Sequence, residues 1–319
     1  MLNWYRFKPV DTLFFRGSEP MVRGENHSAT PIFPPAPSTI AGALRTAVLI
    51  QNGIEFNEYK RDNFNDDKII NSIGRHSDKP PFDVIGPLFL YENKIFIPAP
   101  YSWYMDSDYK KILDKDMVEK VRPIKGFLLN SDLIKTNKEK LFWAKPDKSE
   151  LISMGGYWIS FDDFVKEKDE FELYSINYFV DFEQRTGIAL NDSRIVRDGH
   201  IYSFNHARLK EDCELIFGIN KELPIDSEGI IKLGAEQRFG RYKKLEINIE
   251  IPDSNCDTYL SLSVLPKSDK ANRSIVATGK ILYFGGWDLA KGFHKPMIGY
   301  FPAGSVFDEK IDENLIGIK

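Results

Sequence analysis

The strongest hydrophobic pattern in the chain is a helix that is apolar on nearly every side and follows a proline-rich approach, over residues 31–51. Proline fixes φ and disfavours the helical conformation in the residue before it, so the segment PIFPPAP is predicted to be extended. Ser38 is a suitable N-cap and Gly53 a suitable stop. The pattern predicts a buried helix whose one charge, Arg45, needs a partner. Apolar positions recur at helical spacing on one face: Ile40, Ala43, Leu44, Ala47 and Val48.

Shorter apolar runs predict strands on both sides of this helix. Residues 2–7 form one such run, and residues 84–100 form two runs around Glu92-Asn93-Lys94, which predicts a hairpin. Further on, strands are predicted up to about Arg185, from 200 to 209 and from 213 to 218. The middle third, about 101–175, has no clear periodicity, and we expect it to be an insertion packed on the first domain.

Residues 200–209 alternate with a period of two, as in a strand with two different faces. One face mixes aromatic and potentially cationic side chains, which suits base stacking and phosphate contact in RNA binding. The alternative is that Tyr202 and Phe204 form a core face while the opposite side is solvated. The members of the mixed face are His200, Tyr202, Phe204, His206 and Arg208.

Two glycine-bearing turns in the C-terminal half carry positive charge. Residues 232–244 hold five basic residues and one acid, Glu236, whereas the whole chain has a net charge of −4. Gly234 and Gly240 would let another backbone approach closely; a charged hairpin is the alternative reading. The second turn, Gly285-Gly286-Trp287-Asp288, offers backbone N–H groups to phosphate oxygens and an indole ring for stacking. Positive charge follows it at Lys291, His294 and Lys295.

Composition limits the class of protein. A chain of 319 residues is typical of two domains, and its net charge argues against a freestanding, sequence-blind nucleic-acid binder without excluding a local basic groove. Cys213 and Cys256 cannot form a disulfide framework and have no metal-binding spacing, so a reduced, cytoplasmic setting is expected. No stretch approaches about eighteen apolar residues, so we expect neither a signal peptide nor a membrane span.

The opening of the chain resembles a known family. A short strand, the pattern D-x-L-F-F-R-G from Asp11, and the pattern F-P-P-x-P-S-T-I-A-G-A-L-R-T from Phe33 are similar to the RAMP-type end subunit of type III-B CRISPR effector complexes. R-T-G-I-A-L-N from Arg185, L-G-A-E-x-R from Leu233 and the G-G-W-D turn extend the resemblance, although Ala235 stands where the family has a glycine. The matches cover the first fifty residues and most of the chain after Phe179.

The resemblance implies an α+β fold of two ferredoxin-like (RRM-like, RAMP) modules with insertions, the first over 1–175 and the second over 176–319. It implies a non-catalytic subunit, with no metal and no cofactor, that anchors the 5′ handle of the guide RNA (crRNA) for antiviral defence. The expected partners are the crRNA, the large polymerase-like (cyclase) subunit, an adjacent RAMP backbone subunit and, through the complex, the target RNA. A protruding hairpin near the RNA is expected between Arg185 and Tyr202.

These patterns and the resemblance together give a set of expected RNA-contacting residues. Arg194 and Arg197 are placed on the protruding hairpin, and Gly155 and Gly156 form a glycine turn before two aromatic residues. The complete set is Arg16, Arg45, Gly155, Gly156, Arg185, Gly187, Arg194, Arg197, Tyr202, Gly234, Glu236, Arg238, Phe239, Gly240, Arg241, Gly285, Gly286, Trp287, Lys291, His294 and Lys295.

Two other functions stay open at this point. The G-G-W-D turn invites comparison with the G-G-D-D loop of nucleotide cyclases, but two-metal chemistry needs clustered carboxylates and only Asp288 is present there. A metal-independent CRISPR RNA-processing endoribonuclease of the RAMP group could use His27 as a general base. A structural interaction protein without RNA contact is the third hypothesis, against which the basic glycine turns argue.

Overall fold

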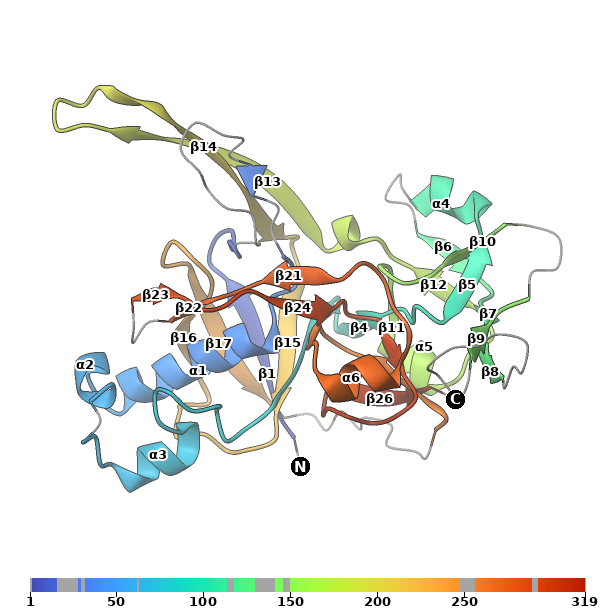
Figure 1. Cartoon of the computed structure of the whole chain (residues 1–319), viewed down its shortest axis with the longest axis horizontal. Coiled ribbons are helices and arrows are strands. Elements are labelled where there is room, and N and C mark those ends of the chain that lie inside the picture. The colour runs from blue at the N-terminus through green and yellow to red at the C-terminus, as the bar shows by residue number, and fades with distance from the viewer. Residues whose placement is uncertain are drawn as a thin grey trace.

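The computed structural model describes residues 2–15, 28–29, 32–61, 63–113, 118–129, 141–145, 150–246, 249, 256–288 and 292–318. The fold is mixed α/β, rich in strands and with few helices (Figure 1). The helices are α1 (Pro37–Gln51), α2 (Phe56–Tyr59), α3 (Asp67–Ile73), α4 (Asp108–Leu113), α5 (Phe161–Val165), α6 (Asp269–Ser274) and the 3₁₀ turn η1 (Ile176–Tyr178).

The buried helix predicted from the sequence is α1. It begins two residues earlier than predicted: Ala36, not Ser38, is the N-cap, and Pro37 occupies the first turn, where its missing N–H costs no hydrogen bond. Gly53 follows the helix with φ of 70°, as the predicted stop requires. Ser38 instead hydrogen-bonds the hydroxyl of Tyr300 in the C-terminal part of the chain.

A seven-stranded sheet organises the rest of the molecule. β1 and β3 each pair antiparallel with β15, which lies between them, and α1 joins β1 to β3 and covers one face. The hairpin predicted over 84–100 is β3–β4, with left-handed Glu92 and Asn93 in its turn. The sheet order is β11 (Trp158–Ser160), β4 (Lys94–Pro98), β3 (Val84–Tyr91), β15 (Cys213–Ile219), β1 (Asn3–Pro9), β17 (Phe239–Leu245) and β16 (Glu228–Lys232).

Alternation along the strands supplies two cores, one on each face of this sheet. Tyr5 and Phe7 of β1 point to the side of α1, whereas Trp4 points to the opposite side, where Leu260 and Ile316 from the end of the chain also pack. The middle third adds small sheets and packs on the main sheet, partly through β11. Its other strands are β5 (Trp103–Asp106), β6 (Glu119–Val121), β7 (Ile124–Lys125), β8 (Phe127–Leu129), β9 (Leu141–Trp143), β10 (Leu151–Ser153) and β12 (Phe171–Leu173).

The strand pairing does not follow the expected division at 175/176. β15, β16 and β17 come after that point in the sequence, yet they pair with β1 and β3 of the opening segment. The sequence hid this because the insertion separates strands that are neighbours in the sheet. Residues 256–318 form smaller sheets: β18 (Thr258–Ser261), β19 (Leu265–Pro266), β20 (Ile275–Ala277), β21 (Leu282–Phe284), β22 (Trp287–Asp288), β23 (Phe293–His294), β24 (Ile298–Phe301), β25 (Val306–Phe307) and β26 (Leu315–Ile318).

Candidate nucleic-acid interface

A long hairpin extends from the body of the molecule (Figure 1). It consists of β13 (Val180–Leu190) and β14 (Val196–Leu209), with β2 (Ser28–Ala29) beside β14. The predicted strands up to Arg185 and from residue 200 are its inner parts, and both continue outward as strand. Gly187 lies opposite Tyr202 in the register, and Arg194 sits in the turn with φ of 59°. The side chains of Arg197 and Tyr202 lie outside the described set.

At the base of the hairpin, Asp11 receives guanidinium groups from three different segments. Arg208 Nη2 of β14 lies 2.9 Å from Asp11 Oδ1, and Arg238 Nη1 of the β16–β17 loop lies 2.9 Å from Asp11 Oδ2. Arg185 of β13 is 3.5 Å from the same carboxylate. Glu183 binds both Arg185 and Arg208. The arrangement ties the hairpin to the β1 end and to the β16–β17 loop.

These contacts shift the ionisation of the two carboxyl groups. Partial burial alone would raise the pKa of Asp11. The hydrogen bonds from the Thr12 N–H and the guanidinium of Arg208 more than offset this effect, so the pKa of that carboxyl is lowered. The pKa of Glu183 is lowered mainly by its hydrogen bond from Arg208, with Arg185 adding to the effect. Both carboxyls are therefore anionic at neutral pH and neutralise the arginines beside them.

The mixed face predicted for residues 200–209 contributes to the core as well as to this cluster. His206 is 1% exposed; its Nδ1 lies 3.2 Å from Thr12 Oγ1, and its ring stacks on Phe14 with centroids 5.1 Å apart. Burial lowers the pKa of His206, although Glu236 at 3.7 Å acts in the opposite direction. Phe204 also packs on Phe14, 4.8 Å between centroids, so the described part of this face is chiefly structural.

The loop between β16 and β17 has the turn geometry that its glycine suggested. Gly234 has φ of 96°, and a Cβ there would lie 2.8 Å from the carbonyl oxygen of Phe14. Glu236 and Gln237 also have positive φ, and Glu236 pairs with Arg238 at 3.3 Å. The close approach of this glycine is thus to the protein's own backbone, and the loop closes the hairpin base.

Charge pairing divides the basic run 232–244 into two parts. Arg238 binds Asp11 and Glu236, Lys243 lies 3.3 Å from Glu228, and Lys244 lies 3.6 Å from Glu222. Lys232 and Arg241, by contrast, are exposed and form no ion pair within the described ranges. Along β17, the exposed Phe239 and Arg241 alternate with buried residues that face α1, so their side chains point away from α1. Arg238, just before this strand, points toward the hairpin base.

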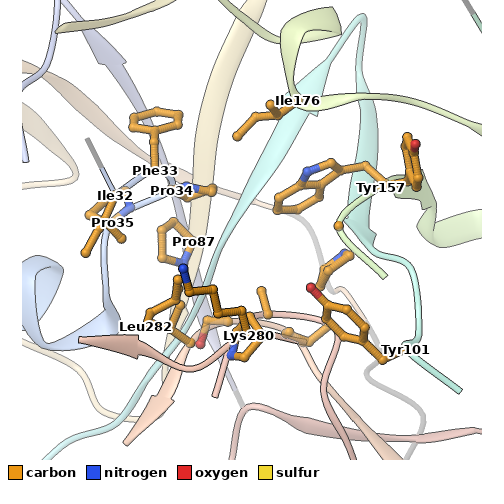
Figure 2. Close-up of a pocket in the computed structure, with 18 of the residues that line it drawn as sticks. Ile32, Phe33, Pro34, Pro35, Pro87, Tyr101, Tyr157, Ile176, Lys280 and Leu282 are labelled. Carbon is orange, nitrogen blue, oxygen red and sulfur yellow. The ribbon is translucent and has the colours of Figure 1, made fainter. Parts of the chain in front are cut away.

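A proline-lined cleft of about 570 Å³ lies between the main sheet and the C-terminal strands (Figure 2). Phe33, Pro34 and Pro35 come from the approach to α1, and Pro87 and Pro98 come from β3 and β4. Trp158 of β11 and Ile176 line it as well. The C-terminal part contributes Lys280, Leu282 and Tyr283, among others. Figure 2 shows Lys280 and Tyr101 on the same side, facing Phe33 and Ile176 across the cleft.

Glycines make room for Tyr101 in this cleft. A Cβ on Gly155 would lie 2.1 Å from the Tyr101 ring, and a Cβ on Gly279 would lie 2.3 Å from its hydroxyl oxygen. Burial raises the pKa of Tyr101, so its hydroxyl stays protonated and can donate a hydrogen bond. Of the predicted glycine turn, Gly156 lines the cleft directly and Gly155 shapes its wall.

Arg45 lies apart from both the hairpin base and the cleft. Its guanidinium donates to the backbone carbonyls of Arg75 and Asp78 and, at 2.6 Å, to the hydroxyl of Tyr59. The one charge in the apolar helix thus finds its partners in the segments around α2 and α3. These bonds stabilise the packing of α1 and engage both terminal nitrogens of the guanidinium that was expected to contact RNA.

The C-terminal glycine turn forms a small hairpin of its own. Gly285 and Gly286 are exposed between β21 and β22, and the Lys295 N–H donates to the carbonyl of Gly286 at 2.8 Å. Trp287 and His294 are paired across β22–β23, but their side chains lie outside the described set. Arg16, His27 and Lys291 also lie outside the described residues.

Sequence reasoning missed Tyr101, Tyr157 and Lys280 of the cleft, and it gave no role to Lys8. Tyr101 gave no signal because the glycines around it are distant in sequence. Lys8 carried a signal: it alternates with the buried Phe7 in a strand, which places it on the other face.

Neither a metal-binding cluster nor a membrane-spanning helix occurs among the described residues. Within the described ranges, no group of three or more histidine, cysteine or carboxylate side chains could hold a metal ion. Across the same residues, the structure contains no helix with the length and apolar character needed to cross a membrane. Cys213 is buried, and this burial raises the pKa of its thiol to about 12.

Comparison with known proteins gives a consistent family match. The family model described as CRISPR-associated protein (Cas_Cmr3) matches residues 5–259. No curated protein matches the chain. A solved structure of the type III-B Cmr-beta bound to cognate target RNA and AMPPnP contains a chain with 15% identity and a TM-score of 0.55, covering 95% of this chain and 85% of that chain. A second structure, of the type III-B Cmr-beta bound to cognate target RNA, contains a chain with 17% identity and a TM-score of 0.54. That match covers 96% of this chain and 86% of that chain.

Proposed function

Because the chain belongs to the CRISPR-associated Cmr3 family and is a subunit of a type III CRISPR effector complex, we propose that it binds the guide RNA and anchors its 5′ handle. The Cmr-beta structures it resembles support this proposal through fold alone, at identities of 15% and 17%. The residues that would hold the RNA are therefore argued from this chain's own geometry.

The fold proposal is that the main sheet is built on a ferredoxin-like module. The order β3-β15-β1-β17, with α1 joining the parallel strands β1 and β3 around an antiparallel β15, supports it. This is a split β-α-β arrangement, to which β4, β11 and β16 add at the edges. We propose a second, reduced module in residues 256–318, on the resemblance of the whole chain to the RAMP group.

The proposal of RNA binding rests on the proline-lined cleft with Lys280. Its volume of about 570 Å³ is within the usual range of about 300–1,000 Å³ for small-ligand sites. Tyr101, Tyr157 and Tyr283 supply rings, and the exposed Lys280 supplies one cation at the edge. An unstacked nucleotide of a single strand needs this combination, because the base is buried against apolar surface while its phosphate meets a cation.

The hairpin-base arginines receive a different role in this proposal. Arg185 and Arg238 were expected to contact RNA, but their guanidiniums bind Asp11, Glu183 and Glu236. We propose that they position the hairpin, which would reach a neighbouring part of the complex. Gly285, Gly286 and Lys295 remain proposed phosphate contacts, since they are exposed. RNA contacts for Arg16, Lys291, Trp287 and His294 stay predictions.

We propose that the subunit is not an enzyme. The endoribonuclease alternative needs an accessible general base. His206, the histidine at the hairpin base, is 1% exposed and bonded to Thr12, so it cannot reach a substrate. His27 remains the residue that this alternative would use. The proposed partners are the large polymerase-like subunit and an adjacent RAMP subunit, in a cytoplasmic complex that engages target RNA.

The test is recovery of the tagged chain from its native cell, followed by sequencing of any RNA that it retains. The proposal expects a large polymerase-like subunit together with short RNAs that share one fixed 5′ end. Lys280→Ala should lower the slope of log K against log salt for single-stranded RNA by about 0.7, whereas Lys68→Ala on α3 should not change it. Recovery without RNA or partner would contradict the proposal, and cleavage of precursor RNA at one site would favour the endoribonuclease.

A further inference from the structure

On the side of the main sheet opposite α1, Trp4 of β1 is buried, but the part of the sheet from Lys8 and Arg241 across to β16 is exposed. Cross-strand register places Lys8 opposite Arg241, and Arg241 opposite Ile230 on the other side. Lys232 is opposite Phe239 in the same way. We call this surface the basic face; it consists of Arg6, Lys8, Glu228, Ile230, Lys232, Phe239, Arg241 and Lys243.

The charges on the basic face are only partly neutralised. Arg6 lies 3.6 Å from Glu214, and Lys243 lies 3.3 Å from Glu228, so one opposed pair of cations has a carboxylate for each member. The next pair along the strands, Lys8 and Arg241, has none among the residues that the structure describes, and neither has Lys232. Directly opposed side chains have Cβ atoms about 4.5–5.5 Å apart, and like charges in that position destabilise a sheet.

The apolar part of the face is as exposed as the charged part. Ile230 is 61% exposed and Phe239 is 44% exposed, and Val10 next to Phe239 is 60% exposed. A phenyl ring beside unpaired cations is the combination that binds single-stranded nucleic acid, because bases stack on the ring while phosphates meet the cations. Two of the three unpaired cations are lysines, which protein–protein interfaces disfavour, so the composition favours a polyanion over a protein partner.

We propose that the basic face is a second RNA-binding surface, separate from the cleft, in which Lys8, Lys232 and Arg241 contact phosphates and Phe239 stacks on a base. This inference rests on the proposed function, since it adds a contact surface to an RNA-binding subunit. The bound polyanion offsets the repulsion between Lys8 and Arg241, so the strain of the opposed pair is relieved in the complex.

The test is a salt titration of the full-length chain with a short, fluorescein-labelled single-stranded RNA, followed by fluorescence anisotropy. Lys8→Gln with Arg241→Gln should lower the slope of log K against log salt by about 1.4, because each phosphate contact on a single strand contributes about 0.7. The matched control is Lys60→Gln with Arg61→Gln after α2, where the same charge is removed from exposed side chains. The control should leave the slope unchanged.

A second variant separates stacking from charge. Phe239→Leu keeps an apolar side chain and removes the ring, so the affinity should fall by roughly 5- to 150-fold with an unchanged salt slope. One outcome is a wild type that binds RNA with a salt slope that the double variant and its control leave equally unchanged. If Lys280→Ala still weakens binding in that case, RNA binding by the basic face is refuted and RNA binding by the cleft is supported. A wild-type chain that binds no RNA refutes both. Loss of a protein subunit from the recovered complex, without loss of RNA affinity, would identify the face as a protein interface instead.

Discussion

At the base of the β13–β14 hairpin three guanidiniums meet three carboxylates, whereas on the basic face Lys8 and Arg241 oppose each other without one in the described part of the chain. The two regions are contiguous, since Lys8 precedes Asp11 by three residues. Both contain arginine and an aromatic ring. They differ in whether carboxylates of the protein itself pair with the cations.

This difference changes what a run of basic residues indicates. The excess of positive charge over residues 232–244 is real in the sequence, but Arg238, Lys243 and Lys244 are paired with carboxylates from distant segments. Paired guanidiniums hold segments together, because a bound phosphate would have to displace a carboxylate already in place. Unpaired cations on an exposed sheet cost stability and are free for a polyanion.

The largest effect is expected from a change that separates the strands carrying the basic face. A Cβ on Gly240 would lie 2.5 Å from both the Lys8 carbonyl oxygen and the Phe7 ring. Gly240→Ala should therefore push β17 away from β1 and lower the free energy of unfolding by roughly 1–3 kcal/mol, as overpacked cores do. Urea denaturation measures it. Gly42→Ala is the matched control, since nothing lies within 4 Å of a Cβ there and stability should not fall.

The next effect concerns the hairpin base alone. Asp11→Asn keeps the shape of the side chain and removes the charge that Arg208 and Arg238 share. Because Asp11 is partly exposed, we expect a loss of about 1–2 kcal/mol in the free energy of unfolding, without a change in the salt slope of RNA binding. Asp192→Asn in the hairpin turn is the control. A fall in RNA affinity without a fall in stability would reverse the roles assigned to the two regions.

Lowering the pH should weaken the ion pairs at the hairpin base, whereas the cations of the basic face stay charged. Folding lowers the pKa of both Asp11 and Glu183, so their ion pairs contribute stability that is fully present above the unfolded-state values of about 4. That contribution is lost as the pH falls through the lower folded-state values. Thermal melts between neutral and acid pH should therefore show a smaller acid loss in Asp11→Asn than in the wild type. Equal acid losses would contradict the assignment.

How much of this could be predicted from the sequence depends on the separation between partners. The helix at 37–51 and the hairpin at 84–98 follow from local pattern and turn chemistry. The inner strands of the long hairpin follow from local pattern, whereas its protrusion was expected from the family resemblance. The family match confirms the resemblance carried by the motifs at Asp11, Phe33 and Leu233. The charge pairing could not be predicted, because Asp11 meets Arg208 and Arg238 across about 200 residues of sequence.

The smallest effect is expected when a carboxylate is removed from the basic face. Glu228→Gln frees Lys243, which is 56% exposed, and adds an unpaired cation to the basic face. The salt slope of RNA binding should rise by at most about 0.7, and RNA affinity should increase. Glu309→Gln, which frees Lys270 on α6, is the matched control and should have no effect on RNA binding. A decrease in affinity would show that Glu228 supports the face in another way.

The most direct test of the contrast compares two double variants that each remove two positive charges: Arg185→Gln with Arg208→Gln, and Lys8→Gln with Arg241→Gln. Both are measured for urea unfolding and for the salt slope of RNA binding. We expect the first pair to lose about 1–2 kcal/mol of stability and to keep its salt slope. We expect the second pair to keep or slightly gain stability and to lose about 1.4 in salt slope. Equal losses of slope in both pairs, or a loss confined to the first, would contradict the roles assigned to the two regions.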